Sequence, residues 1–96
     1  MSDVAKPLEI IHDEANQVFR AVVDGYDCEV EYRLQDKTMV ITHTGVPSPV
    51  GGRGIAALLT KFAVQTAEAK HWKITPACSY AATWFRRNPE YAHLLA

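Results

Sequence analysis

The sequence predicts an α+β domain on a mixed sheet: a four-stranded antiparallel meander, a helix crossover to a parallel fifth strand, and a second helix. Two observations lead to this prediction. Residues 8–44 carry short apolar runs separated by turn signals, which is typical of strands. From residue 55 the apolar period changes to three and four, which is typical of an amphipathic helix. A length of 96 residues fits one domain over 1–96, with residues 1–7 expected to be disordered.

The four strands of the meander are justified by alternation and by the turns between them. Residues 26–34 give the clearest pattern, because apolar and charged side chains alternate there with the period of a half-buried strand. Asp24-Gly25 precedes them and is a strong signal for a two-residue hairpin turn. The four strands are expected at Leu8–His12, Val18–Val23, Tyr26–Leu34 and Met39–Thr44.

The second half predicts two helices around a short strand. One helix is expected from Ile55 to about Lys70, and Trp72–Thr75 is expected to return parallel to the fourth strand through a right-handed crossover. Thr75-Pro76 has the form of a helix start, with Thr as the N-cap and Pro at the first helical position. The second helix should therefore run from Pro76 to Arg87, and Glu90–Ala96 should dock as a final turn.

Composition excludes several classes of function. Hydrophobic residues make up 48% and charged residues 22% of a chain with a formal net charge of −1, unlike the basic footprint of a nucleic-acid binder. No apolar run is long enough for a transmembrane helix and the start lacks a signal sequence, so we expect a cytoplasmic protein. Cys28 and Cys78 are then expected to be free thiols. His and Cys residues show no metal-ligand spacing, so no metal is expected.

A glycine-rich segment opens the first helix and reads Gly51-Gly52-Arg53-Gly54-Ile55-Ala56. Unpaired backbone N–H groups and the positive end of the helix dipole make such a position suitable for a pyrophosphate. The Walker A pattern fails because no Gly-Lys-Ser/Thr follows, and the Rossmann pattern fails because four antiparallel strands precede the loop. The alternative interpretation is a glycine-rich turn into a surface helix.

The stretch from the fourth strand into this helix resembles the coenzyme A motif of the GNAT acetyltransferases. That motif, Arg/Gln-x-x-Gly-x-Gly/Ala, falls on residues 51–56. Three further segments are similar to a subfamily of small single-domain GNAT-like proteins: His43-Thr44-Gly45-Val46-Pro47, Cys78-Ser79-Tyr80, and Arg86-Arg87-Asn88-Pro89-Glu90-Tyr91. The resemblance covers roughly residues 8 to 95.

The resemblance implies an acetyltransferase with acetyl-CoA as cosubstrate. Strands four and five would splay apart to admit the pantetheine arm beside strand four, and the glycine loop would hold the pyrophosphate. The expected cofactor-binding residues are Thr44, Gly45, Val46, Gly51, Gly52, Arg53, Gly54, Ile55, Ala56 and Arg86. For Arg86 the alternative role is the ordinary preference for cations at a helix C-terminus. The acceptor would be an amine of a small molecule or protein, on a shallow face or one that a homodimer or partner protein completes.

Two positions depart from the motifs of the resembled family. Gly51 stands where the motif usually has Arg or Gln, and Gly45 stands where close relatives often carry Glu. Both departures bear on catalysis more than on binding.

Three side chains are the candidate catalytic groups. Cys78 falls in the expected first turn of the second helix, where the dipole lowers a thiol pKa, and it can act as nucleophile, as proton donor to the leaving thiolate, or as a pocket wall. His43 is its natural partner as a general base, with a structural histidine as the alternative. Tyr80 is a candidate general acid. An N-acetyltransferase is the leading hypothesis, beside a non-catalytic CoA-binding module and a cofactor-free interaction domain.

Overall fold

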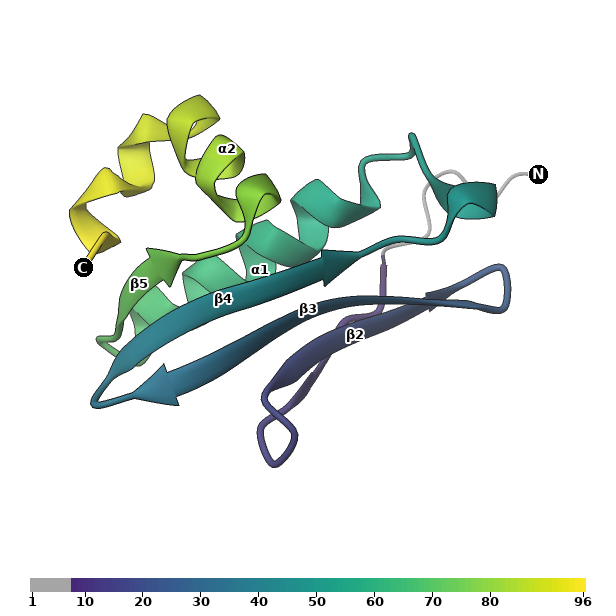
Figure 1. Ribbon diagram of the computed structural model, residues 1–96. Coiled ribbons are helices and arrows are strands. Elements are labelled where there is room, and N and C mark those ends of the chain that lie inside the picture. The colour runs from purple at the N-terminus through teal and green to yellow at the C-terminus, as the bar shows by residue number, and fades with distance from the viewer. Residues whose placement is uncertain (1–7) are drawn as a thin grey trace.

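The computed structural model describes residues 8–96, so the disorder expected for residues 1–7 lies outside the described part of the chain. Five strands form one sheet in the order β1-β2-β3-β4-β5 (Figure 1). The first four are antiparallel and β5 is parallel to β4, which confirms the predicted α+β architecture. The strands are β1 (Ile11–Asp13), β2 (Val18–Val23), β3 (Tyr26–Gln35), β4 (Thr38–Gly45) and β5 (Lys73–Pro76), and the helices are η2 (Ser48–Val50), α1 (Ile55–Ala69), α2 (Ser79–Arg87) and η3 (Pro89–Leu94).

The first strand begins later than the predicted range 8–12. Only Ile11–Asp13 pair with β2, whereas Leu8 and Ile10 pack against the core without strand pairing. The Asp13 carboxylate then accepts hydrogen bonds from the backbone N–H and the side chain of Asn16, at 3.2 and 2.9 Å. These bonds stabilise the turn into β2, which is the function of Asp and Asn in many turns.

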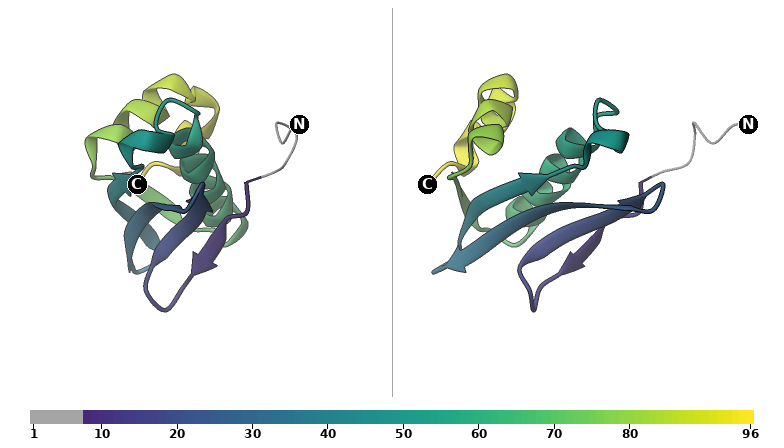
Figure 2. Two further views of the ribbon diagram at one scale, coloured as in Figure 1. Left: turned by 90° about the vertical axis from the view of Figure 1, so that its right-hand side faces the viewer. Right: turned by 45° about the vertical axis from the view of Figure 1, so that its right-hand side comes forward.

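Both helices pack over the same face of the sheet (Figure 2). Inward-facing side chains of β2, β3 and β4 meet those of α1 and α2 in one cluster that includes Phe19, Val30, Ile41, Leu59 and Phe85. Along β3 the alternate residues Glu31 and Arg33 are exposed on the opposite side, called the outer face below. The sheet is thus apolar on one side and charged on the other.

Strands β4 and β5 separate after a short parallel ladder. Pairing runs from Thr38↔Lys73 to Ile41↔Pro76, and the chain then turns over the end of the ladder. The Ile41 carbonyl accepts from the N–H groups of both Ala77 and Cys78, each at 3.0 Å. The prediction that the second helix starts at Pro76 with Thr75 as N-cap is therefore wrong. Pro76 ends β5, and α2 begins at Ser79 with Cys78 as its N-cap.

A β-bulge in β4 follows immediately. Tyr32 pairs with Ile41 but the adjacent Glu31 pairs with His43, which leaves Thr42 as an additional residue in β4. The Thr42 hydroxyl donates to the Glu31 carbonyl at 3.3 Å. Because one extra residue reverses the alternation of side chains, Thr44 lies on the helix side and His43 on the outer face.

The C-terminal segment docks as predicted. Leu94 of η3 is buried, and the Ala96 N–H donates to the Ile74 carbonyl at 2.9 Å beside a bridge between Ile74 and Leu95. The docked segment covers the edge of β5 that does not pair with β4.

No helix within residues 8–96 has both the length and the apolarity needed to cross a membrane.

His12 anchors the edge strand β1 to the core, and its contacts predict how stability depends on pH. His12 stacks on Phe19 at 4.1 Å between ring centroids, and its Nε2 lies 2.6 Å from the Tyr32 hydroxyl. Burial lowers the pKa of His12 below its ordinary 6.5, and Lys70 adds to this effect while Glu14 and Asp13 oppose it. A neutral histidine is therefore favoured in the folded state.

We expect the free energy of unfolding to decrease as the pH falls below 6.5, because the unfolded chain then binds a proton that the folded chain resists. The decrease should level off once the pH is below the folded pKa. Urea denaturation between pH 7.5 and 5 measures it. His12→Gln should reduce this pH dependence, whereas the control His71→Asn, at an exposed position, should keep it. Equal pH dependence in His12→Gln and wild type contradicts the assignment.

Candidate functional site

The separation of β4 from β5 leaves one edge of β4 open. From His43 to Gly45 this strand pairs with β3 on one side, and within the described residues no strand pairs with it on the other. Thr44 and Gly45 are partly exposed, and Val46 packs partly against the core. An open strand edge offers backbone N–H and C=O groups to an extended ligand. The geometry agrees with the splayed strands that the resemblance implied.

Cys78 lies on the helix side of this edge. Its Sγ accepts a hydrogen bond from the Ala81 N–H at 3.4 Å and lies 3.6 Å from the Thr44 hydroxyl. The thiol is therefore both the cap of α2 and a neighbour of β4, and it is partly exposed. Cys28, in contrast, is fully buried, and burial raises the pKa of its thiol. Of the two free cysteines, Cys78 is the one that a reagent or substrate can reach.

His43 lies on the outer face and not beside Cys78. Its Nε2 is 3.8 Å from a carboxylate oxygen of Glu29, and a Cβ at Gly45 would lie only 3.0 Å from the same nitrogen. The expected partnership of Cys78 with His43 is thus not observed, because the bulge at Thr42 directs the two side chains to opposite faces of β4. The sequence did not indicate Glu29 as a site residue, because Glu29 neighbours His43 only in the β3–β4 register that the bulge at Thr42 creates.

The glycine loop presents free backbone donors. Gly52 and Gly54 have φ of 76° and 78°, which favours glycine, and a Cβ at either position would meet nothing within 4 Å. The first bond within α1 runs from the Leu58 N–H to the Gly54 carbonyl at 3.1 Å, so the N–H groups of residues 55–57 precede it. The Gly51 N–H already donates to the Ser48 carbonyl at 3.0 Å, so Gly51, which was expected among the cofactor-binding residues, does not offer that group to a ligand.

Arg53 is paired with a residue of another turn. Asp24 and Gly25 have φ of 50° and 81°, which fits the predicted tight hairpin turn between β2 and β3. The Asp24 carboxylate lies 2.7 Å from the Arg53 guanidinium, with both side chains about half exposed. Such exposed pairs contribute only about 0.2–1 kcal/mol, so an anion on the loop can compete for Arg53.

A groove of about 450 Å³ runs between α1 and α2 and begins at Gly54. Its lining is mainly apolar, through side chains such as Leu58 and Trp84, and it carries Arg53, Lys61 and Arg87 against Glu90. Tyr80 lines this groove, and burial raises the pKa of its hydroxyl while Arg87 opposes the rise.

Arg87, and not the expected Arg86, lines the groove. Arg86 donates to the Thr83 hydroxyl at 3.0 Å along the helix surface. The spacing of Tyr80, Thr83 and Arg87 by three and four residues is the helical signal that would have identified the groove-facing arginine.

Metal-ligating side chains do not gather here: in the described range 8–96, no three His, Cys, Asp or Glu residues are placed to hold an ion.

Comparison with known proteins adds two findings. A family model described as GCN5-related N-acetyl-transferase matches residues 18–94, which is most of the chain. The NMR solution structure of a GCN5-like protein from Staphylococcus aureus, described as a candidate N-acetyltransferase, is similar over 95% of this chain and 90% of that chain. That similarity has a TM-score of 0.74 and 29% sequence identity.

The double role of Cys78 gives a stability prediction. Cys78→Ala removes the acceptor for the Ala81 N–H and should lower the free energy of unfolding by about 1 kcal/mol. Cys78→Ser keeps an N-cap acceptor and should be at least as stable as wild type, because Ser is a preferred N-cap residue. Urea denaturation measures both. Equal destabilisation of the two variants would show that the Cys78 thiol does not stabilise the protein by capping α2.

Proposed function

The chain belongs to the GCN5-related N-acetyltransferase family, and we propose that it binds acetyl-CoA and transfers the acetyl group to an amine. One observation carries the proposal. The open edge of β4 lies beside the thiol of Cys78, and Gly54 at the start of α1 lines one groove with Tyr80, two residues after Cys78. Those groups match the three parts of the ligand, which are an extended amide-containing arm, a pyrophosphate and a thioester.

The backbone N–H groups of the glycine loop are placed to bind a pyrophosphate. Residues 52–57 supply backbone N–H groups at the positive end of α1, whose first turn has no acidic residue. Gly52 and Gly54 permit a close approach, because there is open space where a Cβ would be. Arg53 can add a charge-assisted contact once it leaves Asp24.

The two ends of the ligand have separate surroundings. The pantetheine arm would lie beside β4 from Val46 toward Thr42, where its amides can pair with the strand edge. The nucleotide end would lie toward the groove between α1 and α2, where Lys61 and Arg87 offer cations and Trp84 offers apolar surface.

Transfer requires stabilisation of charge at the thioester. Backbone N–H groups on the open edge of β4 can polarise the acetyl carbonyl as oxyanion character develops. Cys78 stands beside that edge, so its thiol can protonate the departing thiolate. In this mechanism the amine attacks directly, and positioning supplies much of the rate.

Titration of acetyl-CoA into 15N-labelled protein tests cofactor binding. We expect amide shifts at Gly52, Gly54 and Ala56 from the pyrophosphate, and at Val46 and Cys78 from the pantetheine and thioester. No shifts at millimolar acetyl-CoA would rule out both the transferase and a non-catalytic CoA-binding module.

Two variants sharpen this titration. Arg53→Gln should weaken acetyl-CoA binding, and Asp24→Asn should tighten it a few-fold, since the Asp24 carboxylate competes with phosphate for the guanidinium. In the Arg53→Gln background, Asp24→Asn should have a smaller effect. An equal effect in both backgrounds means that Asp24 acts on the phosphates without Arg53.

The role of Cys78 in turnover is a separate prediction. Release of CoA thiol in the presence of an acceptor amine should fall about 10²-fold in Cys78→Ala, as expected for loss of a proton donor. Acetyl-CoA affinity, measured in parallel, should change little. Full turnover in Cys78→Ala would show that the thiol is only a wall of the pocket and the cap of α2.

A further inference from the structure

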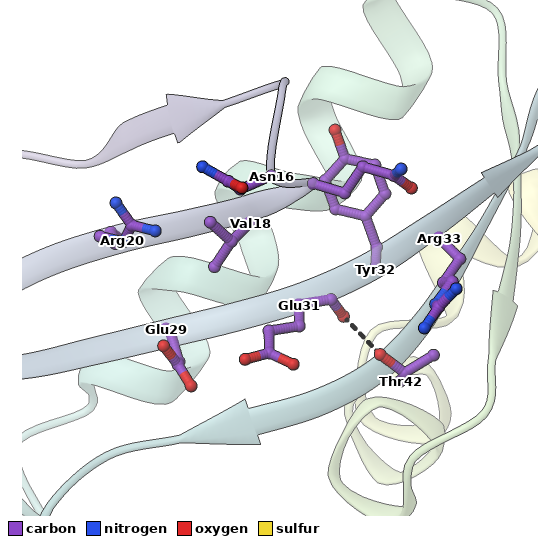
Figure 3. Close-up of a pocket in the computed structure, with 9 residues that line it drawn as sticks. Asn16, Val18, Arg20, Glu29, Glu31, Tyr32, Arg33 and Thr42 are labelled. Atoms are coloured by element: carbon purple, nitrogen blue, oxygen red, sulfur yellow. Dashed lines mark hydrogen bonds between the residues drawn. The ribbon is translucent and has the colours of Figure 1, made fainter.

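The outer face of the sheet has a hollow of about 480 Å³ on the side away from both helices (Figure 3). Figure 3 shows Glu31 and Arg33 of β3 and Thr42 of β4 among the side chains that line it. Thr42 is the bulge residue, so the hollow reaches the point where β4 becomes an open edge. The cofactor site proposed above lies across β4, on the helix side.

His43 and Glu29 stand together on this outer face. Their side chains approach to 3.8 Å, from Nε2 to Oε2. Glu29 is directly opposite Gly45 in the register of β3 and β4, and a Cβ at Gly45 would lie 3.7 Å from Glu29 Cγ as well as 3.0 Å from His43 Nε2. The glycine therefore leaves the space in which the imidazole and the carboxylate meet.

Glu29 is also tied to other charged groups. Burial raises its pKa, and so does Glu31, through a side-chain hydrogen bond and its charge, whereas His43 and Arg20 act in the opposite direction. The charged groups that line the hollow around the pair are thus Glu29, Glu31 and Arg33 of β3 and Arg20 of β2. No group from a helix lines this hollow within the described residues.

Building on the proposed function, we propose that the acceptor amine reaches β4 from the outer face through this hollow, and that Glu29 positions His43 to take its proton. The acetyl donor and the acceptor then approach β4 from opposite faces. His43 is the catalytic residue of this pair and Glu29 is a positioning residue.

The acceptor nitrogen loses two protons in this step. A carboxylate facing Nε2 favours the tautomer with its proton there, so Nδ1 has the free lone pair and accepts one proton from the acceptor ammonium. The neutral nitrogen attacks the carbonyl carbon of the thioester, a C–N bond forms and the C–S bond breaks. The departing thiolate takes the proton of the Cys78 thiol, the second proton lost by nitrogen restores that thiol, and His43 later releases its own proton to water. The products are the N-acetyl amine and CoA thiol.

A double-mutant cycle on turnover tests whether Glu29 acts through His43. CoA thiol release is measured from acetyl-CoA with ethanolamine, spermidine, glucosamine and a lysine peptide as acceptors. His43→Ala should lose about 10²-fold in kcat, with partial rescue by added imidazole. Glu29→Gln should lose about tenfold in kcat with little change in the KM for acetyl-CoA, and should add no more than about twofold to His43→Ala.

The chain offers a matched control in a second histidine–glutamate pair. His93 and Glu68 approach to 3.3 Å and are similarly exposed, but they lie on η3 and α1 and not on the outer face beside the hollow. Glu68→Gln should leave turnover unchanged. Full additivity of Glu29→Gln with His43→Ala, or a change confined to the KM for acetyl-CoA, would overturn the proposal.

A titration that needs no turnover decides the pairing separately. The Glu29 side-chain carboxyl is followed by 13C NMR as the pH changes. His43→Gln should raise the pKa of Glu29 further, because it removes a charge that lowers it, and Glu31→Gln should lower it. An unchanged Glu29 titration in His43→Gln contradicts the pair. Acetyl-CoA binding without acetylation of any amine would instead contradict the transfer activity itself.

Discussion

The backbone carbonyl of Ile41 is the point on which the site depends. It accepts two N–H groups, from Ala77 and Cys78, just after the last pair of the parallel ladder. Those bonds turn the chain away from β4, so β5 cannot continue beside it. The same turn places Cys78 at the N-cap of α2, within 3.6 Å of the Thr44 hydroxyl. One acceptor thus sets both the open strand edge and the position of the thiol.

The bulge at Thr42 completes this arrangement. Without an extra residue, His43 would continue the inward series of Met39 and Ile41 and would point toward the helices. With it, Thr44 takes the inward position opposite Val30, and His43 is opposite Glu31 on the outer face. The strand therefore presents different chemistry on its two sides over two consecutive residues. A bulge is a common means of redirecting side chains next to a site.

The fold was largely predictable because its signals are local. Alternation in β3, the Asp24-Gly25 turn and the helical period after Ile55 each act over a few residues, and the structure confirms the elements they predict. The start of α2 was not predictable in this way. Thr75-Pro76 has the form of a helix start, but Pro76 is held in β5 by its pairing with Ile41, a contact distant in sequence. Tertiary pairing thus overrode the local preference.

Prediction of the candidate site had the same limit. The free donors of the glycine loop follow from the local requirement of Gly52 and Gly54 for positive φ, and they lie where the motif indicated. The engaged N–H of Gly51 and the pair between Arg53 and Asp24 depend on folded neighbours. Glu29 and the placement of His43 depend on a register shift that nothing in the segment Thr42-His43-Thr44 signals.

The charged side chains that line the helix side of the sheet differ from those on its outer face. On the helix side, Arg53, Lys61 and Arg87 line a groove with Glu90, and even with Asp24 paired to Arg53 the cations are in excess, which favours an anionic ligand. On the outer face, Arg20 and Arg33 line the hollow together with Glu29 and Glu31, so the two signs balance there, and Glu29 is the carboxylate beside His43. Under the proposed function, the anionic cofactor would therefore approach the helix side, and the carboxylate beside His43 would face an acceptor ammonium on the outer face. They can meet only where β4 has no partner, which is the short segment that the Ile41 carbonyl leaves open.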